Sequence, residues 1–205
     1  MKKAIVVLSL AAASFGLAPL GRAADHKKAD ADETVTISLD VAMDASSARA
    51  SRPDWSITGP LRGDTFISGG LVYAGGLIPE GDTSATFTPG DEGRLGTLVV
   101  RGQYIADGAE IASGARHSVA STHIFRLDEG SGVVTEGLEG AGPEVRAVVG
   151  GYGRYSGATG QVTQENLGFN GTAGSNLRFT FTLKVATGQE PSDLMMQRKG
   201  APRRR

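Results

Sequence analysis

The residues best suited to acid–base or metal chemistry in this sequence are its three histidines, because the chain has no cysteine. The lack of cysteine excludes disulfides, thiolate metal sites and a cysteine nucleophile. His117 and His123 fall on one face of an expected strand, separated by about 20 Å at roughly 3.3 Å per residue. They are too far apart to bind one metal ion together, so we expect no metal site.

Strand alternation orients two further candidates. His123 has the opposite parity from Arg126, so if Arg126 faces water, His123 points into the interior. An inward histidine is either a core residue satisfied by a hydroxyl or carbonyl group or a residue that transfers protons, and the sequence leaves both open. Tyr104 shares the face of Leu98 and Val100, so we expect it to face inward, with its hydroxyl at the mouth of the interior.

Three other motifs are better explained as turns than as functional sites. The run 151–157, GYGRYSG, is similar to a dinucleotide-binding loop, but its third glycine comes one position late and a strand pattern follows instead of a helix. The tripeptide 62–64, RGD, matches a cell-adhesion signal, and 170–172, NGT, matches both a glycosylation signal and a favoured two-residue turn. No serine sits in a strained nucleophile turn, and we assign no catalytic residue.

The elements that would position these residues alternate with a period of two. In residues 34–41 apolar side chains at odd positions alternate with polar ones at even positions, and residues 177–185 repeat the pattern. Turn signals, mostly glycine, recur along the chain, and no interior segment keeps a helical period. The expected strands are residues 34–41, 65–73, 96–105, 117–127, 132–138, 146–151, 158–165 and 177–185, with long loops over 44–62 and 78–94. We therefore predict an all-β fold, a closed eight-stranded antiparallel β-barrel without exposed sheet edges.

Both ends of the chain differ in composition from the expected barrel. Residues 1–23 have the layout of a cleaved secretory signal, with a basic start, an apolar run and small residues near Ala23. A membrane anchor is the alternative, but polar residues and a proline interrupt the run. We expect export to the periplasm or the medium, without stable insertion in a membrane. We expect residues 24–33 to be a flexible lead-in, 34–185 the barrel domain and 186–205 a flexible basic tail.

The net charge of −1 gives no reason to expect nucleic-acid binding. Residues 198–205 carry five positive charges, so the rest of the exported chain is acidic. This basic tail is either a solvated end or a tether to an anionic surface, and binding through a tether would weaken as salt is added.

The segment 147–160, AVVGGYGRYSGATG, resembles the conserved glycine-rich corner of dirigent and allene-oxide-cyclase-like barrels. Residues 176–183, NLRFTFTL, are similar to the final strand of the bacterial members, and the resemblance covers residues 34–185. Tyr152 departs from the pattern, which usually has threonine there. The resemblance implies an eight-stranded antiparallel barrel with an apolar pocket, often assembled as a trimer. It also implies that an unsaturated lipid or phenolic molecule is oriented there for ring closure or radical coupling without a cofactor.

The leading hypothesis is an exported barrel that binds a small hydrophobic molecule and, if it is an enzyme, acts as a cofactor-free cyclase or isomerase. An eight-stranded barrel can be just wide enough for one small ligand. Strand parity gives the pocket candidates Leu98, Val100, Tyr104, His123, Phe125, Phe179 and Phe181. The alternative is a non-catalytic oligomeric envelope or interaction scaffold with a solid barrel core, which the scarcity of inward acid–base groups favours. The sequence leaves open whether the protein is an enzyme.

Overall fold

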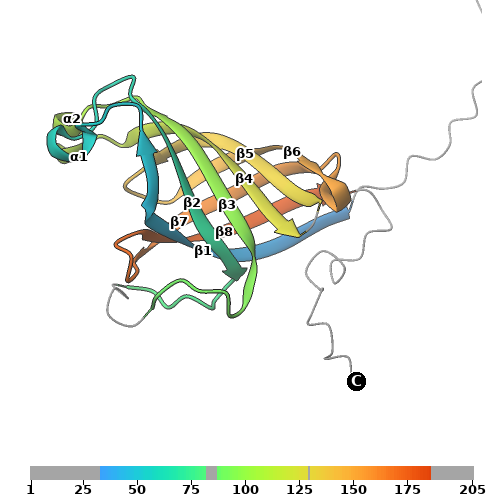
Figure 1. Cartoon of the computed structure of the whole chain (residues 1–205). Helices are drawn as coiled ribbons and strands as arrows, with labels where there is room; N and C mark the ends of the chain where they lie inside the picture. The colour runs from blue at the N-terminus through green and yellow to red at the C-terminus, as the bar shows by residue number, and fades with distance from the viewer. Residues whose placement is uncertain (1–32, 82–86, 129, 186–205) are drawn as a thin grey trace, which may run out of the picture.

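A computed structural model describes residues 33–81, 87–128 and 130–185. These residues form a closed barrel in which each strand pairs antiparallel with the next and the last pairs with the first (Figure 1). The strands are β1 (Glu33–Ala50), β2 (Thr65–Ala74), β3 (Arg94–Tyr104), β4 (His117–Asp128), β5 (Ser131–Gly140), β6 (Glu144–Tyr152), β7 (Thr159–Phe169) and β8 (Ser175–Val185). The predicted eight-stranded antiparallel barrel is confirmed, because period-two patterns recur along the chain with short turns between most of them.

Alternation along each strand separates the barrel interior from its outer surface. In β8 the side chains of Leu177, Phe179, Phe181 and Leu183 are buried in the interior, while Arg178, Thr180 and Thr182 on the other face are partly exposed. The interior core is Val35, Ile37, Leu39, Val41, Val72, Leu98, Val100, Phe125, Val133, Val148, Tyr155, Ala158, Val162, Leu177, Phe179, Phe181 and Leu183. Three phenylalanines form its centre, with ring centroids 5.0 Å apart for Phe125 and Phe179 and 5.1 Å apart for Phe125 and Phe181.

The two ends of the barrel differ in structure. Two short helices, α1 (Trp55–Thr58) and α2 (Gly108–Ala112), lie together at one end, which we call the helical end (Figure 1). The 3₁₀ turn η1 (Gly153–Tyr155) belongs to the opposite end, where Tyr155 is buried in the core. Gly153 has a φ of 62°, and a Cβ there would lie 2.2 Å from the Gly130 carbonyl oxygen. Only glycine fits this corner, which is why the segment 151–157 has a glycine-rich sequence.

The first strand is longer than expected, because residues 44–50, which were predicted to begin a long loop, continue it. β1 pairs with β2 as far as Asp44, then the register shifts and pairing resumes at Arg49. Ser47 fills the interruption, since its Oγ accepts a hydrogen bond from Gly69 N at 2.8 Å and donates to Asp44 O at 2.6 Å. Such a bulge bends a strand, and the residues after it lie at the rim of the helical end.

A loop after β2 covers part of the outer surface. Asp40, on the outer face of β1, is fully buried beneath this loop. Its carboxylate accepts hydrogen bonds from Ile78 N at 2.9 Å and from Arg178 Nε at 2.9 Å. Ile78 packs with Tyr73 and Leu167 in a small cluster outside the barrel. Asp40 therefore anchors the loop and has no part in the interior.

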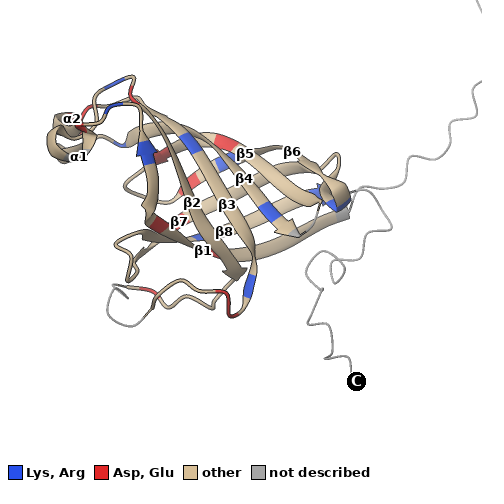
Figure 2. Ribbon diagram, viewed as in Figure 1, with Lys and Arg blue, Asp and Glu red and all other residues tan. Residues whose placement is uncertain are grey.

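The predicted signal (1–23), the lead-in up to residue 32 and the basic tail (186–205) lie outside the described residues. Among the helices described, none is long and apolar enough to cross a membrane. In the view of Figure 2, charged residues of both signs are interspersed over the barrel and its loops.

Candidate functional site

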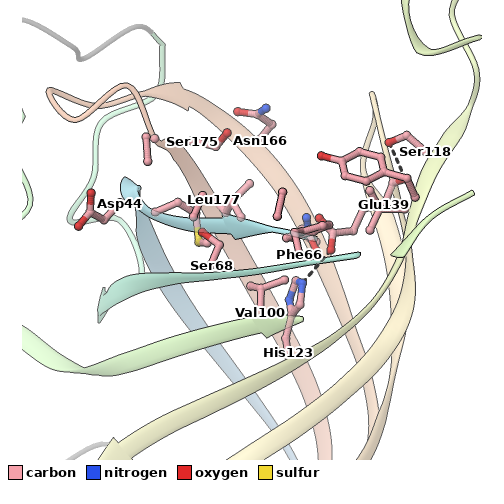
Figure 3. A pocket seen from close by; sticks show the side chains of 18 of the residues that line it. Asp44, Phe66, Ser68, Val100, Ser118, His123, Glu139, Asn166, Ser175 and Leu177 are labelled. Atoms are coloured by element: carbon pink, nitrogen blue, oxygen red, sulfur yellow. Dashed lines mark hydrogen bonds and ion pairs between the residues drawn. The ribbon is translucent and has the colours of Figure 1, made fainter. Parts of the chain in front are cut away.

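A cavity of about 420 Å³ enters the barrel from the helical end, where Trp55 of α1 lines it. Figure 3 shows side chains of its lining. Its walls come from strands β1 to β5, from β7 and β8, and from α1. The lining includes Met43, Asp44, Arg49, Trp55, Phe66, Ser68, Val100, Tyr104, Ser118, Val119, His123, Glu139, Gln164, Asn166, Ser175 and Leu177. The cavity is thus a mixed surface of apolar walls and a few polar groups, which is typical of a small-molecule site.

His123 lies at the inner limit of this cavity and is fully buried. One ring nitrogen, Nε2, is 3.0 Å from Glu139 Oε1, as the dashed line in Figure 3 marks. The ring stacks edge-on against Phe179, with centroids 5.5 Å apart, and is 6.3 Å from Phe125. Aromatic packing on one side and a carboxylate on the other fix the orientation of the imidazole.

A buried arginine supports the carboxylate. Arg146, on β6, points into the barrel with 1% of its surface exposed. Its Nη2 donates to Ser121 O at 2.8 Å and to Ser121 Oγ at 2.9 Å, and its Nη1 lies 3.7 Å from Glu139 Oε1. Ser121 in turn donates a short hydrogen bond to Glu139 and lies 3.3 Å from His123 Nε2. The guanidinium balances the charge of Glu139 in a region from which water is largely excluded.

The pairing of β4, β5 and β6 brings these residues together. Val119 is opposite Glu139 in the register and His123 is opposite Thr135, so Glu139 reaches diagonally along the barrel to the imidazole. Gly137 lies between the two cross-strand pairs. A Cβ there would lie 2.9 Å from Arg146 Cγ. Because Gly137 has no side chain, the Arg146 side chain has room inside the barrel.

The electrostatics of the cluster set its protonation state. Burial raises the pKa of Glu139, but interactions with His123, Ser121 and Arg146 outweigh burial and lower the pKa to about 2. Burial lowers the pKa of His123 below its usual value, and the hydrogen bond that His123 donates to Glu139 opposes this shift without reversing it. At neutral pH the cluster contains a neutral imidazole, a carboxylate and a guanidinium.

Aromatic side chains surround the mouth of the cavity. The Tyr104 ring is 5.4 Å from that of Phe66 and 6.2 Å from that of Trp55. Burial raises the pKa of Tyr104, and the Glu139 charge adds to this, so its phenol stays protonated at neutral pH. Arg52 holds the segment that carries Trp55, because its Nε donates to both carboxylate oxygens of Asp64 at 2.9 Å.

Three buried polar atoms have no hydrogen-bond partner among the described residues: Trp55 Nε1, His123 Nδ1 and Gln164 Oε1. All three residues line the same cavity. A buried polar atom without a partner costs free energy, so three such atoms in residues around one cavity set this region apart from the rest of the interior.

The predicted pocket residues divide into two groups. Val100, Tyr104 and His123 line the cavity, whereas Leu98, Phe125, Phe179 and Phe181 pack in the core and are not among its lining residues. Whether a ligand contacts any of them stays a prediction. Strand parity places inward side chains correctly, but it gives no information about which of them leave space between them.

Sequence reasoning missed Glu139, Arg146, Gln164 and Trp55. The expected strand ended at residue 138, so Glu139 was assigned to the turn, although β5 continues to Gly140. Parity within β5 contained the signal, because Glu139 shares the inward face of Val133 and Thr135. Trp55 lies outside any strand, in the expected long loop over 44–62, so its place in a long loop was the only signal for it and parity gave none.

Three sequence motifs have structural roles. Asp64 of the RGD tripeptide is bound to Arg52, and Asn170 of the NGT motif is fully buried and donates to Met43 O at 3.0 Å. The glycine-rich run 151–157 leads into strand β7, not into a helix. Among the described residues, no group of three or more histidine, aspartate or glutamate side chains could hold a metal ion.

No protein-family model matches the chain, and no curated protein matches it in sequence. Among solved structures, one pterocarpan synthase dirigent protein superposes with a TM-score of 0.54 at 12% identity, covering 83% of this chain and 100% of that chain. A second pterocarpan synthase dirigent protein gives a TM-score of 0.51 at 13% identity, covering 76% and 97%. A pyocyanin demethylase aligns with a TM-score of 0.46 at 18% identity, covering 73% and 99%.

The fold is therefore a dirigent-like β-barrel, as the resemblance in the sequence implied. At these identities the likeness defines the architecture and not the chemistry.

Proposed function

We propose that this protein binds one small hydrophobic molecule inside the helical end of its barrel and orients it for reaction, as a cyclase, isomerase or dirigent-type protein would. The observation that carries the proposal is the cavity itself, which ends on the buried His123 and is lined by three residues that each have a buried polar atom without a partner among the described residues. Apolar walls would supply affinity, and the few polar groups would fix the orientation of the bound molecule. The dirigent names of two structural neighbours support the same class of ligand.

The alternative is a scaffold with a solid barrel. The phenylalanine core at the centre of the barrel favours it, because Phe125, Phe179 and Phe181 fill the interior there. The cavity at the helical end does not fit this alternative, since a purely structural barrel gains stability when its interior is filled. We therefore place ligand binding first and the scaffold second.

Native mass spectrometry of the protein purified from its own host tests the proposal. We expect an adduct of small-molecule mass that is lost on denaturation. Val100→Trp would fill the cavity and should abolish the adduct, whereas Arg101→Trp, on the outer face of the same strand, should retain it. Adduct-free protein, even after incubation with lipid and phenolic extracts, would favour the scaffold.

We also propose that the protein is exported and forms a homo-oligomer. The secretory layout of residues 1–23 supports export, and N-terminal sequencing of the protein recovered from periplasm or medium would locate the cleavage site near Ala23. Exposed apolar side chains on the outer face, including Leu138, Val145 and Val149, support a homo-oligomer, for which we propose a trimer. Light scattering after size-exclusion chromatography would give the mass.

A further inference from the structure

We propose that His123 is a catalytic base and that the molecule in the cavity is a hydrophobic carbonyl compound, from which His123 removes a proton on the carbon next to the carbonyl group. This inference rests on the proposed function, to which it adds a reaction and a chemical class of ligand. Three features of the cavity support it: the unprotonated nitrogen of His123, the balance of charge around this residue and the hydrogen-bond donors at the mouth.

The hydrogen bonds of the imidazole determine which of its two nitrogens lacks a proton. A carboxylate can only accept hydrogen bonds, so the ring nitrogen that contacts Glu139, Nε2, must carry the proton. In a neutral ring the other nitrogen, Nδ1, then has a free lone pair. Nδ1 is buried and has no partner among the described residues, and the residue lines the cavity. A lone pair in this position is a proton acceptor directed by a carboxylate–histidine pair.

The surrounding charges favour proton uptake by this nitrogen during reaction. The charged groups that act on the ring are Glu139 on β5 and Arg146 on β6. Before reaction they balance each other beside a neutral imidazole. When Nδ1 takes a proton, the imidazolium faces the Glu139 carboxylate, and the anion formed on the ligand offsets the new positive charge. The cluster and its ligand therefore keep the same total charge throughout, which limits the electrostatic cost of reaction in a buried site.

Two donors that line the same cavity suit the carbonyl oxygen of such a ligand. The Trp55 Nε1–H has no acceptor among the described residues, and the Tyr104 phenol stays protonated at neutral pH. Both side chains line the cavity that His123 closes. Proton removal next to a carbonyl requires a base at the C–H bond and a hydrogen-bond donor at the carbonyl oxygen two bonds away, because the donor stabilises the developing enolate oxygen.

The reaction is a balanced proton transfer. The C–H bond next to the carbonyl breaks, its proton moves to His123 Nδ1, and its electron pair moves into the carbonyl group to form an enolate. In a β,γ-unsaturated carbonyl compound, the enolate is conjugated with the double bond. Return of the proton to the γ-carbon then gives the conjugated α,β-unsaturated isomer. No electron is gained or lost, so the step needs no oxidant or reductant.

The first experiment needs no ligand. Nitrogen-15 NMR of the purified protein at pH 7 distinguishes the two neutral forms of each histidine from the imidazolium. We expect His123 to be neutral with its proton on Nε2, and Glu139→Gln to disturb this preference because an amide can donate as well as accept. His123 protonated on Nδ1 at pH 7, in either the neutral or the charged form, would overturn the proposal.

The second experiment measures turnover with 3-cyclohexen-1-one, whose conversion to 2-cyclohexen-1-one is followed by the absorbance of the conjugated product. We expect isomerisation above the buffer rate, and a loss of about 10² to 10⁴-fold in His123→Gln, the range typical of a general base. The rate should rise with pH as His123 loses its proton and then stay constant. Because burial lowers the pKa of His123, the midpoint of this rise should lie below pH 6.5. His117→Gln is the matched control, since His117 lies on the same strand but pairs with Glu144 at 3.3 Å outside the cavity.

The two proposals can fail separately. Binding of the ketone is read by saturation-transfer NMR, with Val100→Trp as the blocked cavity. Binding without isomerisation, or isomerisation that survives in His123→Gln, would overturn the base while leaving the ligand cavity in place. No isomerisation together with no cavity-dependent binding would overturn the base and its carbonyl ligand. The adduct measurement on protein from the native host would then decide the proposed function independently.

Discussion

Glu139 and His123 lie on neighbouring strands, and their side chains meet inside the barrel with Glu139 Oε1 3.0 Å from His123 Nε2. The contact is diagonal, because the residue opposite Glu139 in the register is Val119. It places a carboxylate with a pKa of about 2 beside a fully buried imidazole. The cavity therefore ends on an imidazole whose orientation is fixed by a charged carboxylate.

Glycine at position 137 is needed to seat the buried arginine. Gly137→Ala would bring a Cβ to 2.9 Å from Arg146 Cγ, so we expect a loss of about 1–3 kcal/mol in the free energy of unfolding. Urea denaturation measures this change. Gly150→Ala, on β6 with open space around its Cβ position, is the control and should change stability much less. Equal effects of the two substitutions would contradict a specific role for Gly137.

Acid should weaken the fold through Glu139. Its pKa is lowered from 4.5 to about 2 in the folded protein, so the carboxylate stabilises the fold fully above pH 4.5 and progressively less as the pH falls toward 2. We expect the melting temperature of Glu139→Gln to depend less on pH in this window. Glu136→Gln, exposed on the outer face of the same strand, should retain the dependence of the unmodified protein. Parallel curves for all three proteins would refute the prediction.

The phenylalanine core should dominate stability. Phe181→Ala removes a ring that is 2% exposed and packs 5.1 Å from Phe125, at an expected cost of about 3–5 kcal/mol. Chemical denaturation with a check of near-ultraviolet circular dichroism measures it. Val149→Ala, at a side chain that is 51% exposed, should stay within about 0.5 kcal/mol of the unmodified protein. A small loss in Phe181→Ala would mean that the interior is loosely packed.

The loop after β2 should depend on Asp40. Asp40→Asn removes the charge that Arg178 contacts at 2.9 Å and weakens acceptance from Ile78 N, for an expected loss of about 1–3 kcal/mol. Hydrogen exchange of the Ile78 amide should accelerate. Glu80→Gln is the control, because Glu80 pairs with the same arginine at 3.0 Å but is largely exposed, and such pairs contribute under about 1 kcal/mol. Unchanged exchange in Asp40→Asn would show that the loop is held by its apolar contacts.

Much of the fold follows from local pattern. Alternation together with glycine turn signals placed seven of the strands within a few residues of their observed bounds, and alternation assigned His123 and Phe179 to the interior. Such predictions succeed because the pleat turns successive side chains to opposite faces in any strand. The exception was β1, where the bulge after Asp44 interrupts the alternation and hid the continuation of the strand to Ala50.

By itself, the sequence determined the class of fold, since turn signals and period-two alternation require no knowledge of distant residues. Only the tertiary structure decided which inward residues surround space and which fill it. Val100 and Phe125 both point inward, yet Val100 lines the cavity and Phe125 packs against two other rings. The difference depends on the summed volumes of side chains from every strand and on the register that sets them level with one another. Neither quantity can be read from one segment of the chain.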